Sequence, residues 1–372
     1  MKKVLHIVAK MNLGGTESFL MNIYRNIDKT KVQFYFLTFY EKDEKGFFDE
    51  EILHYGGKII NIPSIKKVGI LQTIKNIRQV LRKNDIDIIH CHTTHSCGLS
   101  LFAAKLENIK IRIIHSHNVG NGEKFNIIRF LYKLSMKVLI NSVSNKFAAC
   151  SKKSAEYLFF KKNIKNFHFI PNGIDFNKFI NSNANEKELK KELNIPIDAK
   201  IIGHIGRYGK VKNHEFIIKM FKQLISNNSN IYLILIGDGP TRPTISKEIH
   251  NLNINNNVRV LGLRTDVEKL LNIMDVFILP SLFEGFGIVL LEAQSIGIPC
   301  VVSENIQKEV DIGLNLIKWV KLDNIDKWIQ TILNNLDSKI DNKQTILNAI
   351  EKSPYKLNNI IKKFYQLYEI QG

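Results

Sequence analysis

The stretch from Pro280 to Ala293 carries residue types that could bind a phosphate group. It reads Pro-Ser-Leu-Phe-Glu-Gly-Phe-Gly-Ile-Val-Leu-Leu-Glu-Ala. Gly285 and Gly287 allow a sharp backbone turn, and the free N–H groups of such a loop suit phosphate when a helix follows. Glu284 and Glu292 flank that loop with carboxylates. Either acid alone could be an ordinary solvated side chain, so the specificity comes from the whole string.

The residues on either side of this loop predict how it is positioned. Residues 276–279 are continuously apolar and predict a short buried strand. Residues 288–296 predict a helix, which Gly297 and Pro299 end before a second apolar strand at 300–302. The predicted unit is therefore strand, glycine loop, helix and strand.

Two cations follow another predicted strand, at residues 201–205. Arg207 and Lys212 lie in the loop Gly-Arg-Tyr-Gly-Lys-Val-Lys-Asn. An arginine fork and a lysine point charge can both stabilise the negative charge of a phosphate group. The loop is not a Walker motif, because Lys210 is followed by Val211 instead of Ser or Thr.

Three further loops near the start of the chain also follow apolar strands. Gly14 and Gly15 follow residues 4–9, without the Gly-x-Gly-x-x-Gly spacing of a dinucleotide site. A run of three histidines and two cysteines, at 90–97, follows residues 86–89 and leaves a zinc site open as an alternative. The strand 111–114 is followed by His115-Ser116-His117-Asn118, where histidines can face a ligand crevice or only bond to the backbone.

These strings together resemble those of family 4 glycosyltransferases, which have the GT-B fold. The resemblance covers residues 1 to about 303 and fades after Val302. It rests on the 280–293 string, Gly-Gly-Thr-Glu at 14–17, Pro-Asn-Gly-Ile-Asp at 171–175 and the Gly-Arg…Lys-Asn motif at 206–213.

The resemblance implies transfer of a sugar from a nucleotide-sugar donor, expected to be UDP-linked, with retention at the anomeric carbon. No covalent intermediate is expected. The catalytic residues it implies are His117, Glu284, Arg207 and Lys212. The donor-binding residues it implies are Gly14, Gly15, Arg207, Lys212, Glu284, Phe286, Gly287, Ile288 and Glu292.

The implied roles differ from residue to residue. Glu284 and the backbone after it hold the hydroxyls of the donor sugar, and Glu292 holds the ribose. His117 lies beside the transferred sugar, while His90 and His92 line or support the cleft. Since Arg207 and Lys212 supply the positive charge, no metal ion and no cofactor are expected.

The alternation of strands and helices in both halves predicts an α/β protein of the GT-B fold, with two doubly wound Rossmann-like domains facing a central cleft. We expect an acceptor-side domain over residues 1–176 and a donor domain over 195–354. The polar residues 177–194 are expected to link them. An amphipathic helix at 355–372 is expected to return to the first domain.

Charge is unevenly distributed along the 372 residues, whose formal net charge is +18. Residues 1–175 hold 28 Lys and Arg against 14 Asp and Glu. Such a surplus suits a polyanion: a phosphorylated substrate, an anionic membrane surface or a nucleic acid. An aromatic and basic helix expected at 125–140 favours a membrane surface, although it could instead cover the core with a solvated basic face.

The four cysteines show no disulfide spacing, and no apolar stretch is long enough for a transmembrane helix. We therefore expect a cytoplasmic protein, or one that is peripheral on the inner face of the cell membrane. The expected acceptor is a glycan or lipid-linked glycan of capsule or exopolysaccharide biosynthesis. The alternatives are a GT-B sugar-nucleotide epimerase and a basic nucleic-acid-binding protein. No recognised nucleic-acid module supports the second alternative, so no nucleic-acid partner is expected.

Overall fold

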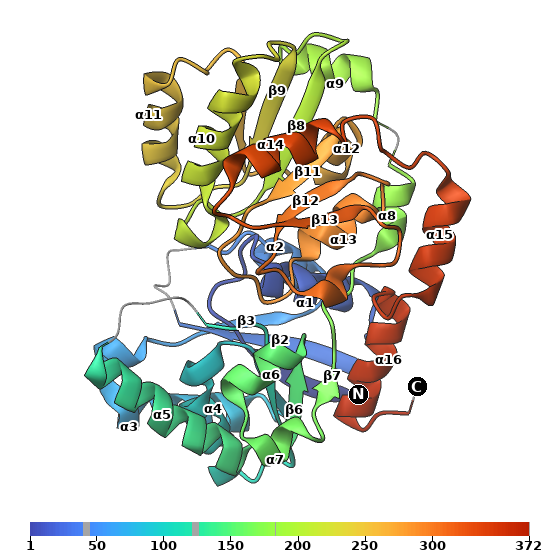
Figure 1. Cartoon of the computed structure of the whole chain (residues 1–372). Helices are drawn as coiled ribbons and strands as arrows, with labels where there is room; N and C mark the ends of the chain where they lie inside the picture. Colours follow the sequence, from blue (N-terminus) through green and yellow to red (C-terminus); the bar gives the residue numbers. More distant parts are fainter. Residues whose placement is uncertain (40–44, 121–125, 183, 372) are drawn as a thin grey trace. The chain divides into compact units, whose positions relative to one another are not determined.

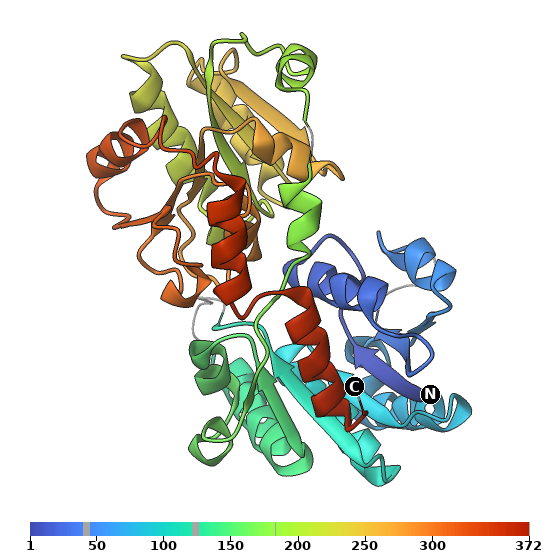
Figure 2. The same cartoon turned by 90° about the vertical axis from the view of Figure 1, so that its right-hand side faces the viewer.

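The chain folds into two compact α/β units. The computed structural model describes residues 1–372 except 40–44, 121–125, 183 and 372. Unit 1 comprises Met1–Gly173 and Leu357–Gly372, and unit 2 comprises Ile174–Lys356. Each unit is built on one parallel sheet with helices on both faces (Figures 1 and 2). The predicted α/β class with two doubly wound parallel sheets is therefore confirmed.

The sheet of unit 1 has seven parallel strands in the order β3-β2-β1-β4-β5-β6-β7. The strands are β1 (Lys2–Ile7), β2 (Val32–Thr38), β3 (Lys58–Asn61), β4 (Ile88–Cys91), β5 (Ile111–Ser116), β6 (Lys146–Ala149) and β7 (His168–Phe169). The helices are α1 (Gly15–Asn26), α2 (Asp49–His54), α3 (Ile65–Lys83), α4 (Cys97–Leu106), α5 (Ile127–Val143), α6 (Lys152–Leu158), α7 (Lys161–Ile164) and α16 (Leu357–Tyr368), with a 3₁₀ turn at Thr94–Ser96.

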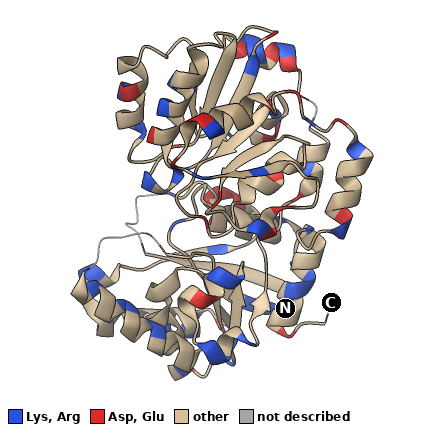
Figure 3. Ribbon diagram, viewed as in Figure 1, with Lys and Arg blue, Asp and Glu red and all other residues tan. Residues whose placement is uncertain are grey.

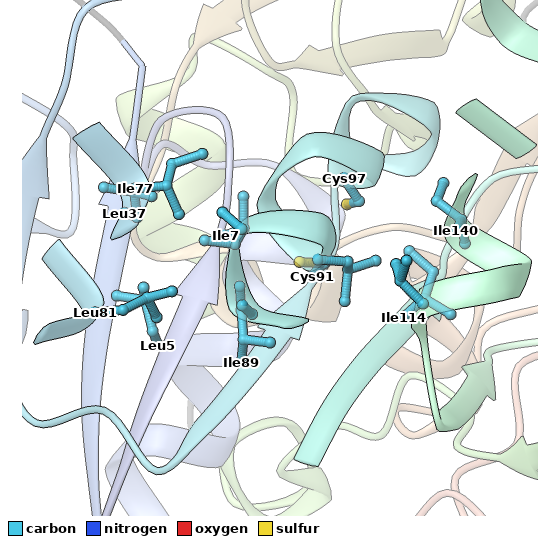
Figure 4. Packing of buried hydrophobic residues seen from close by; sticks show 14 of the residues in the cluster. Leu5, Ile7, Leu37, Ile77, Leu81, Ile89, Cys91, Cys97, Ile114 and Ile140 are labelled. Atoms are coloured by element: carbon cyan, nitrogen blue, oxygen red, sulfur yellow. The ribbon is translucent and has the colours of Figure 1, made fainter. Parts of the chain in front are cut away.

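Alternate residues of these strands enter two different layers, because successive side chains of a strand point to opposite faces. Leu5 and Ile7 of β1 join an apolar layer with Ile89 of β4 and with residues of α3, α4 and α5 (Figure 4). His6, which lies between Leu5 and Ile7, contacts the aromatic rings of β2 on the opposite face. The second face of this sheet therefore carries polar histidine side chains, and helices cover it.

Helix α16 belongs to unit 1, although it ends the chain. Phe364 and Tyr368 are completely buried, and the ring of Phe364 meets that of Phe19 on α1 at 5.9 Å. Burying two such side chains contributes on the order of 2 kcal/mol each. This burial explains why a helix so distant in sequence joins the first sheet.

The sheet of unit 2 has six parallel strands in the order β10-β9-β8-β11-β12-β13. The strands are β8 (Lys200–Ile205), β9 (Ile231–Ile236), β10 (Val258–Gly262), β11 (Val276–Leu279), β12 (Cys300–Ser303) and β13 (Ile317–Val320). The helices are α8 (Phe176–Ile180), α9 (Glu186–Glu192), α10 (His214–Ile225), α11 (Arg242–Asn251), α12 (Val267–Asn272), α13 (Ile288–Gln294), α14 (Ile325–Leu333) and α15 (Lys343–Lys352), with 3₁₀ turns at Lys210–Lys212 and Lys308–Val310.

The strand order of each sheet reverses at one place, between β1 and β4 in unit 1 and between β8 and β11 in unit 2. Loops leave the carboxyl ends of the strands in opposite directions there, so the backbone opens a crevice where open α/β sheets bind ligands. The loops that carry Gly14, His92, Arg207 and Glu284 follow these four strands, whereas the loop that carries His117 follows β5.

The structure corrects two expected boundaries. Residues 177–194 were expected to link the domains, but α8 and α9 form there and unit 2 begins at Ile174. Their polar composition reflects exposed helix faces, while Phe179 and Leu189 are buried. The basic helix expected at 125–140 is α5, from Ile127 to Val143, and Phe125 lies outside the described residues. Among the described helices, none is long and apolar enough to cross a membrane.

Candidate active site

The loops after β8 and β11 are joined side by side in unit 2. The backbone N–H of Leu282 donates to the carbonyl of Val211 at 2.8 Å, and Asn213 Nδ2 donates to the carbonyl of Pro280 at 3.2 Å. Asn213 has a φ of 58°, a left-handed conformation that asparagine tolerates better than most residues. These bonds hold the Gly-Arg…Lys-Asn loop against the 280–287 loop.

An ion pair connects the two loops at their centre. Lys212 Nζ lies 2.6 Å from Glu284 Oε1, and the two side chains are only 19% and 12% exposed. Charge-assisted bonds of this length are short and strong, and partial burial reduces screening by solvent. The structure thus brings together two predicted site residues that are 72 positions apart in sequence.

Arg207 extends from the same loop and is exposed. Within the described part of the chain, no hydrogen bond or ion pair of its guanidinium is present. It therefore offers its full fork of donors to an anion near Lys212. Of the two predicted phosphate-binding cations after β8, Lys212 is thus paired and Arg207 is open.

Backbone contacts bring the loop after β9 against the same crevice. Gly237 has a φ of 134°, and a Cβ atom there would lie 2.1 Å from the carbonyl oxygen of Gly206. Only glycine fits so close an approach. Gly287, with a φ of 81°, precedes α13, and the adjacent Phe286 is buried against the ring of Tyr355. Phe286, Gly287 and Ile288 therefore present backbone N–H groups at the beginning of α13.

Glu292 lies one turn inside α13 and keeps a partly exposed edge. Burial of its carboxyl group raises the pKa of Glu292 to about 7, with Lys178 opposing the shift and Glu268 adding to it. A carboxylate with this pKa can accept hydrogen bonds from hydroxyl groups at neutral pH, but it is sensitive to small pH changes.

In unit 1, Gly14 and Gly15 lie between β1 and α1. Gly14 is the N-cap residue of α1 and has no side chain to bond the first N–H groups of the helix. A Cβ atom at this position would lie 2.2 Å from Glu17 Oε2. The first N–H groups of a 12-residue helix therefore follow the switch-point strand β1. This placement suits an anionic group.

Five histidines form a buried cluster on the second face of the unit 1 sheet. His6 of β1 is the register partner of His90 of β4, and the positions two residues further along β4 and β5 continue the same face. All five are at most 4% exposed: His6, His90, His92, His115 and His117.

Hydrogen bonds join three of these rings in a row. His6 Nδ1 lies 3.0 Å from His92 Nε2, and His92 Nδ1 lies 2.9 Å from His117 Nε2. Burial lowers the pKa of His117 to about 4, and the side chain of Asn172 partly opposes this shift. His117 is therefore neutral at pH 7, and its neighbour Asn172 belongs to the Pro-Asn-Gly turn.

The mixed zinc site left open at residues 90–97 does not form. Cys91 and Cys97 enter the apolar layer of Figure 4, whereas His90 and His92 lie on the opposite face. Among the described residues, two all-histidine sets have ligand atoms within 4.8 Å of one another. These sets are His6, His90 and His92, and His92, His115 and His117.

The motif reasoning missed His6 and Tyr368. Tyr368 OH lies 2.9 Å from His90 Nδ1, and both are completely buried. The sequence did contain an indication for His6. The two His-x-His strings at the ends of strands predict rings aligned on one face of the sheet, and His6 lies at the position of β1 that points to the same face. Tyr368 had no such signal, since its contact depends on where α16 docks.

Comparison with known proteins agrees with this architecture. The family profile described as Glycosyltransferase Family 4 matches residues 13–178, and that described as Glycosyl transferases group 1 matches residues 185–352. The putative glycosyltransferase EpsF of Bacillus subtilis (strain 168) is 34% identical, covering 99% of this chain and 97% of its own length. The chain therefore belongs to glycosyltransferase family 4.

Two further comparisons concern more distant proteins. The UDP-Gal:alpha-D-GlcNAc-diphosphoundecaprenol alpha-1,3-galactosyltransferase of Escherichia coli is 26% identical over 75% of this chain and 74% of its own length. The crystal structure of Anabaena HepE in complex with UDP and glucose superposes with a TM-score of 0.78 at 18% identity, covering 99% of this chain and 100% of that one. The predicted GT-B fold is confirmed.

Proposed function

We propose that this glycosyltransferase moves a hexose from a UDP-linked donor to a lipid-diphosphate-linked glycan, with retention at the anomeric carbon. The observation that carries the proposal is the Lys212–Glu284 ion pair at the switch point of unit 2, with Arg207 beside it. An arrangement of cations next to a carboxylate suits a diphosphate joined to a sugar.

Each group has a role in this reaction. Arg207 and Lys212 stabilise the charge that grows on the departing diphosphate, in place of a metal ion. Glu284 and the backbone of Phe286–Ile288 hold the hydroxyls of the sugar, and Glu292 holds those of the ribose. His117 contacts the transferred sugar as a neutral imidazole, since burial keeps its pKa near 4.

The acceptor part of the proposal rests on charge and on relatives. Unit 1 contains the surplus of basic residues along residues 1–175, which suits a diphosphate group on the acceptor. The Escherichia coli relative acts, by its name, on a GlcNAc-diphosphoundecaprenol acceptor with a UDP-Gal donor. Synthesis of capsule or exopolysaccharide fits this pair of substrates.

We also propose that α5 attaches the protein to an anionic bilayer. Only Ile140, Asn141 and Val143 of α5 are buried, so the helix covers the core only at its carboxyl end. Its exposed apolar side chains are Ile127, Ile128, Phe130, Leu131, Tyr132, Leu134 and Val138. Figure 3 shows Lys and Arg between these positions. An apolar stripe between cations suits an anionic headgroup region.

Arg207→Ala and Lys212→Ala test the donor assignment. Each variant is expected to weaken UDP binding by roughly 10-fold or more while leaving uridine binding little changed, because only the diphosphate contact is lost. Thermal shift against a panel of nucleotides and nucleotide sugars measures this effect. Wild-type UDP affinity in both variants would contradict the assignment.

The reaction itself is tested with an undecaprenyl-diphosphate-linked acceptor. UDP release that depends on the acceptor, together with an α-linked product from an α-linked donor, supports retaining transfer. An epimerised sugar nucleotide formed without acceptor would favour the epimerase. Full loss of activity in chelator, restored by a divalent metal, would overturn the metal-independent mechanism.

A further inference from the structure

The loop at residues 285–288, which leads into α13, has one buried side chain. Phe286 is 2% exposed, whereas the glycines on either side of it are only partly buried. The ring of Phe286 meets the ring of Tyr355, which is 3% exposed, with centroids 5.2 Å apart and an interplanar angle of 57°. Two glycines leave the backbone of this loop with few restraints of its own. The contacts of Phe286 therefore restrain where the backbone N–H groups of the loop lie.

Tyr355 connects this loop to the 3₁₀ turn that follows β12. Its hydroxyl group donates to the backbone carbonyl of Glu309, in the turn Lys308–Val310. Burial raises the pKa of Tyr355 to about 12, so the hydroxyl stays protonated and able to donate at neutral pH. The tyrosine side chain thus contacts one loop through its ring and a second one through its hydroxyl.

The same 3₁₀ turn is bound to the other end of α13. Gln294 is completely buried, and its side-chain amide donates to the carbonyl of Val310 at 2.9 Å. A closed set of contacts therefore leads from the loop at 285–288 through Tyr355 and the turn to the end of α13. These contacts restrain the helix at both ends, and Glu292 lies between them.

Tyr355 itself lies in the chain segment that passes from unit 2 back to unit 1. The next residue, Lys356, is the last of unit 2, and it forms an isolated parallel bridge with Ile174, where unit 2 begins. The two segments that connect the units therefore run side by side next to Tyr355. Its ring projects from a backbone that is held by pairing, which makes it a firm support for Phe286.

We propose that Tyr355 is a positioning residue for the donor sugar. It holds the ring of Phe286 and so keeps the backbone N–H groups of residues 286–288 directed at the sugar hydroxyls. Tyr355 does not touch the substrate and acts only through this loop. The role of the N–H groups rests on the proposed function, whereas the hold of Tyr355 on the loop does not.

Relaxation of backbone ¹⁵N nuclei in the unliganded protein tests the hold on the loop. We expect order parameters of about 0.85 for Gly287 and Ile288 in the wild type and below about 0.6 in Tyr355→Ala, because the ring of Phe286 loses its neighbour. Tyr355→Phe keeps the ring and should keep the wild-type values. Rigid values in a folded Tyr355→Ala would overturn the proposal, whether or not the protein transfers a sugar.

Ligand affinity and turnover test the positioning role. Tyr355→Ala is expected to weaken binding of UDP-glucose and to lower kcat by roughly 10- to 100-fold, because the N–H groups that hold the sugar are misplaced. Its affinity for UDP alone should stay close to that of the wild type, since Arg207 and Lys212 are unchanged. Tyr355→Phe should recover most of the loss. An equal loss for UDP and UDP-glucose, or no recovery in Tyr355→Phe, would contradict the role.

A double-mutant cycle tests whether Tyr355 acts through Phe286. If it does, the double variant Phe286→Ala/Tyr355→Ala should have a kcat no lower than that of the weaker single variant. Losses that add in the cycle would contradict this route.

The matched control is Ile332→Ala on α14, because Ile332 is completely buried in the core of unit 2. It should lower the melting temperature but leave kcat and the order parameters of the loop unchanged while the protein is folded. If the loop behaves as expected but the wild-type protein transfers no sugar, the proposed function fails while the hold of Tyr355 on the loop stands.

Discussion

At position 284 the carboxylate already has a cation, Lys212 Nζ at 2.6 Å, before any substrate is bound. The pair holds the loops after β8 and β11 in register with each other. It also directs one oxygen of the glutamate toward the lysine. A donor sugar would therefore meet a carboxylate whose orientation is set in advance, which lowers the entropic cost of positioning.

Glu284→Gln is expected to leave the fold intact and to lower turnover on the order of 100-fold or more, because the neutral amide loses the ion pair and the charged bond to the sugar. Steady-state turnover with the best donor measures this. Glu351→Gln is the matched control, since Glu351 is an exposed glutamate paired with Lys356. Near-wild-type turnover of Glu284→Gln would remove this residue from the site.

We expect Glu292 to make donor binding sensitive to pH. Its pKa is raised to about 7, so the carboxylate proposed to accept from ribose hydroxyls is largely protonated one unit below that value. Affinity for UDP-glucose should therefore fall by roughly 10-fold from pH 8 to pH 6, in proportion to the ionised fraction. Titration calorimetry measures it, with UDP-glucose used because its diphosphate does not titrate in this range. The Glu292→Gln variant should bind UDP-glucose weakly, with an affinity that does not change between pH 8 and pH 6. If its affinity still falls over this range as in the wild type, another group causes the pH dependence.

At the scale of the element, α5 has more exposed apolar residues than any other helix that the structure describes in unit 1. Ile128 is 76% exposed and Leu131 56% exposed, so they contribute little to the core. Lys137, in contrast, donates to the carbonyl of Tyr157 at 2.8 Å and is half-buried. In the proposed membrane contact, Arg129 and Lys133 are the charges of α5 expected to meet the headgroups.

Removing those charges should weaken attachment to anionic vesicles. Each basic residue near such a surface contributes about 1 kcal/mol, a term that salt screens within about 8 Å. Wild-type protein should co-sediment with anionic vesicles, bind neutral ones little and be released by salt. Arg129→Glu/Lys133→Glu should pellet less while still binding UDP.

The control for α5 is Lys66→Glu/Lys75→Glu, an equal charge change on exposed positions of α3. Ile128→Ser/Leu131→Ser tests the apolar stripe separately. If both charge variants pellet equally, attachment depends on the total charge of the protein and not on α5.

At the scale of the whole molecule, the buried histidines are expected to make the free energy of unfolding sensitive to acid. Burial lowers the pKa of nine of the 11 histidines, to about 3 for His6 and about 4 for His117. Below pH 6.5 the unfolded chain takes up protons that the folded protein does not. Each of these histidines that is buried therefore reduces the free energy of unfolding by about 1.4 kcal/mol per pH unit until its folded pKa is reached. The exposed His168 contributes less, because solvent screens its interactions. Glu292 acts in the opposite direction between about pH 7 and 4.5, but it is a single group.

The melting temperature should therefore fall steeply between pH 6.5 and pH 5, more than in a protein whose histidines are exposed. Circular dichroism at several pH values, with ionic strength held constant, measures the change. A melting temperature that stays constant over this range would mean that the histidines are accessible in the folded protein.

The sequence alone determined the local units. Continuous apolar runs such as 276–279 predicted buried parallel strands, and Gly285 and Gly287 predicted the turn into α13, because both depend on neighbours within a few residues. The loops that carry Arg207, Lys212 and Glu284 could be identified in the same way. The polar composition of residues 177–194 led to the wrong prediction of a linker, since composition does not distinguish an exposed helix from a linker.

Only the tertiary structure decided which of these units meet. Lys212 reaches Glu284 because β8 and β11 are neighbours where the strand order reverses, and strand order leaves no trace in local periodicity. His6 joins the cluster through the register of β1 with β4, and Tyr368 through the docking of α16. The low pKa of His117 follows from this burial, because a ring enclosed by other neutral rings has no solvent or carboxylate to stabilise its charged form.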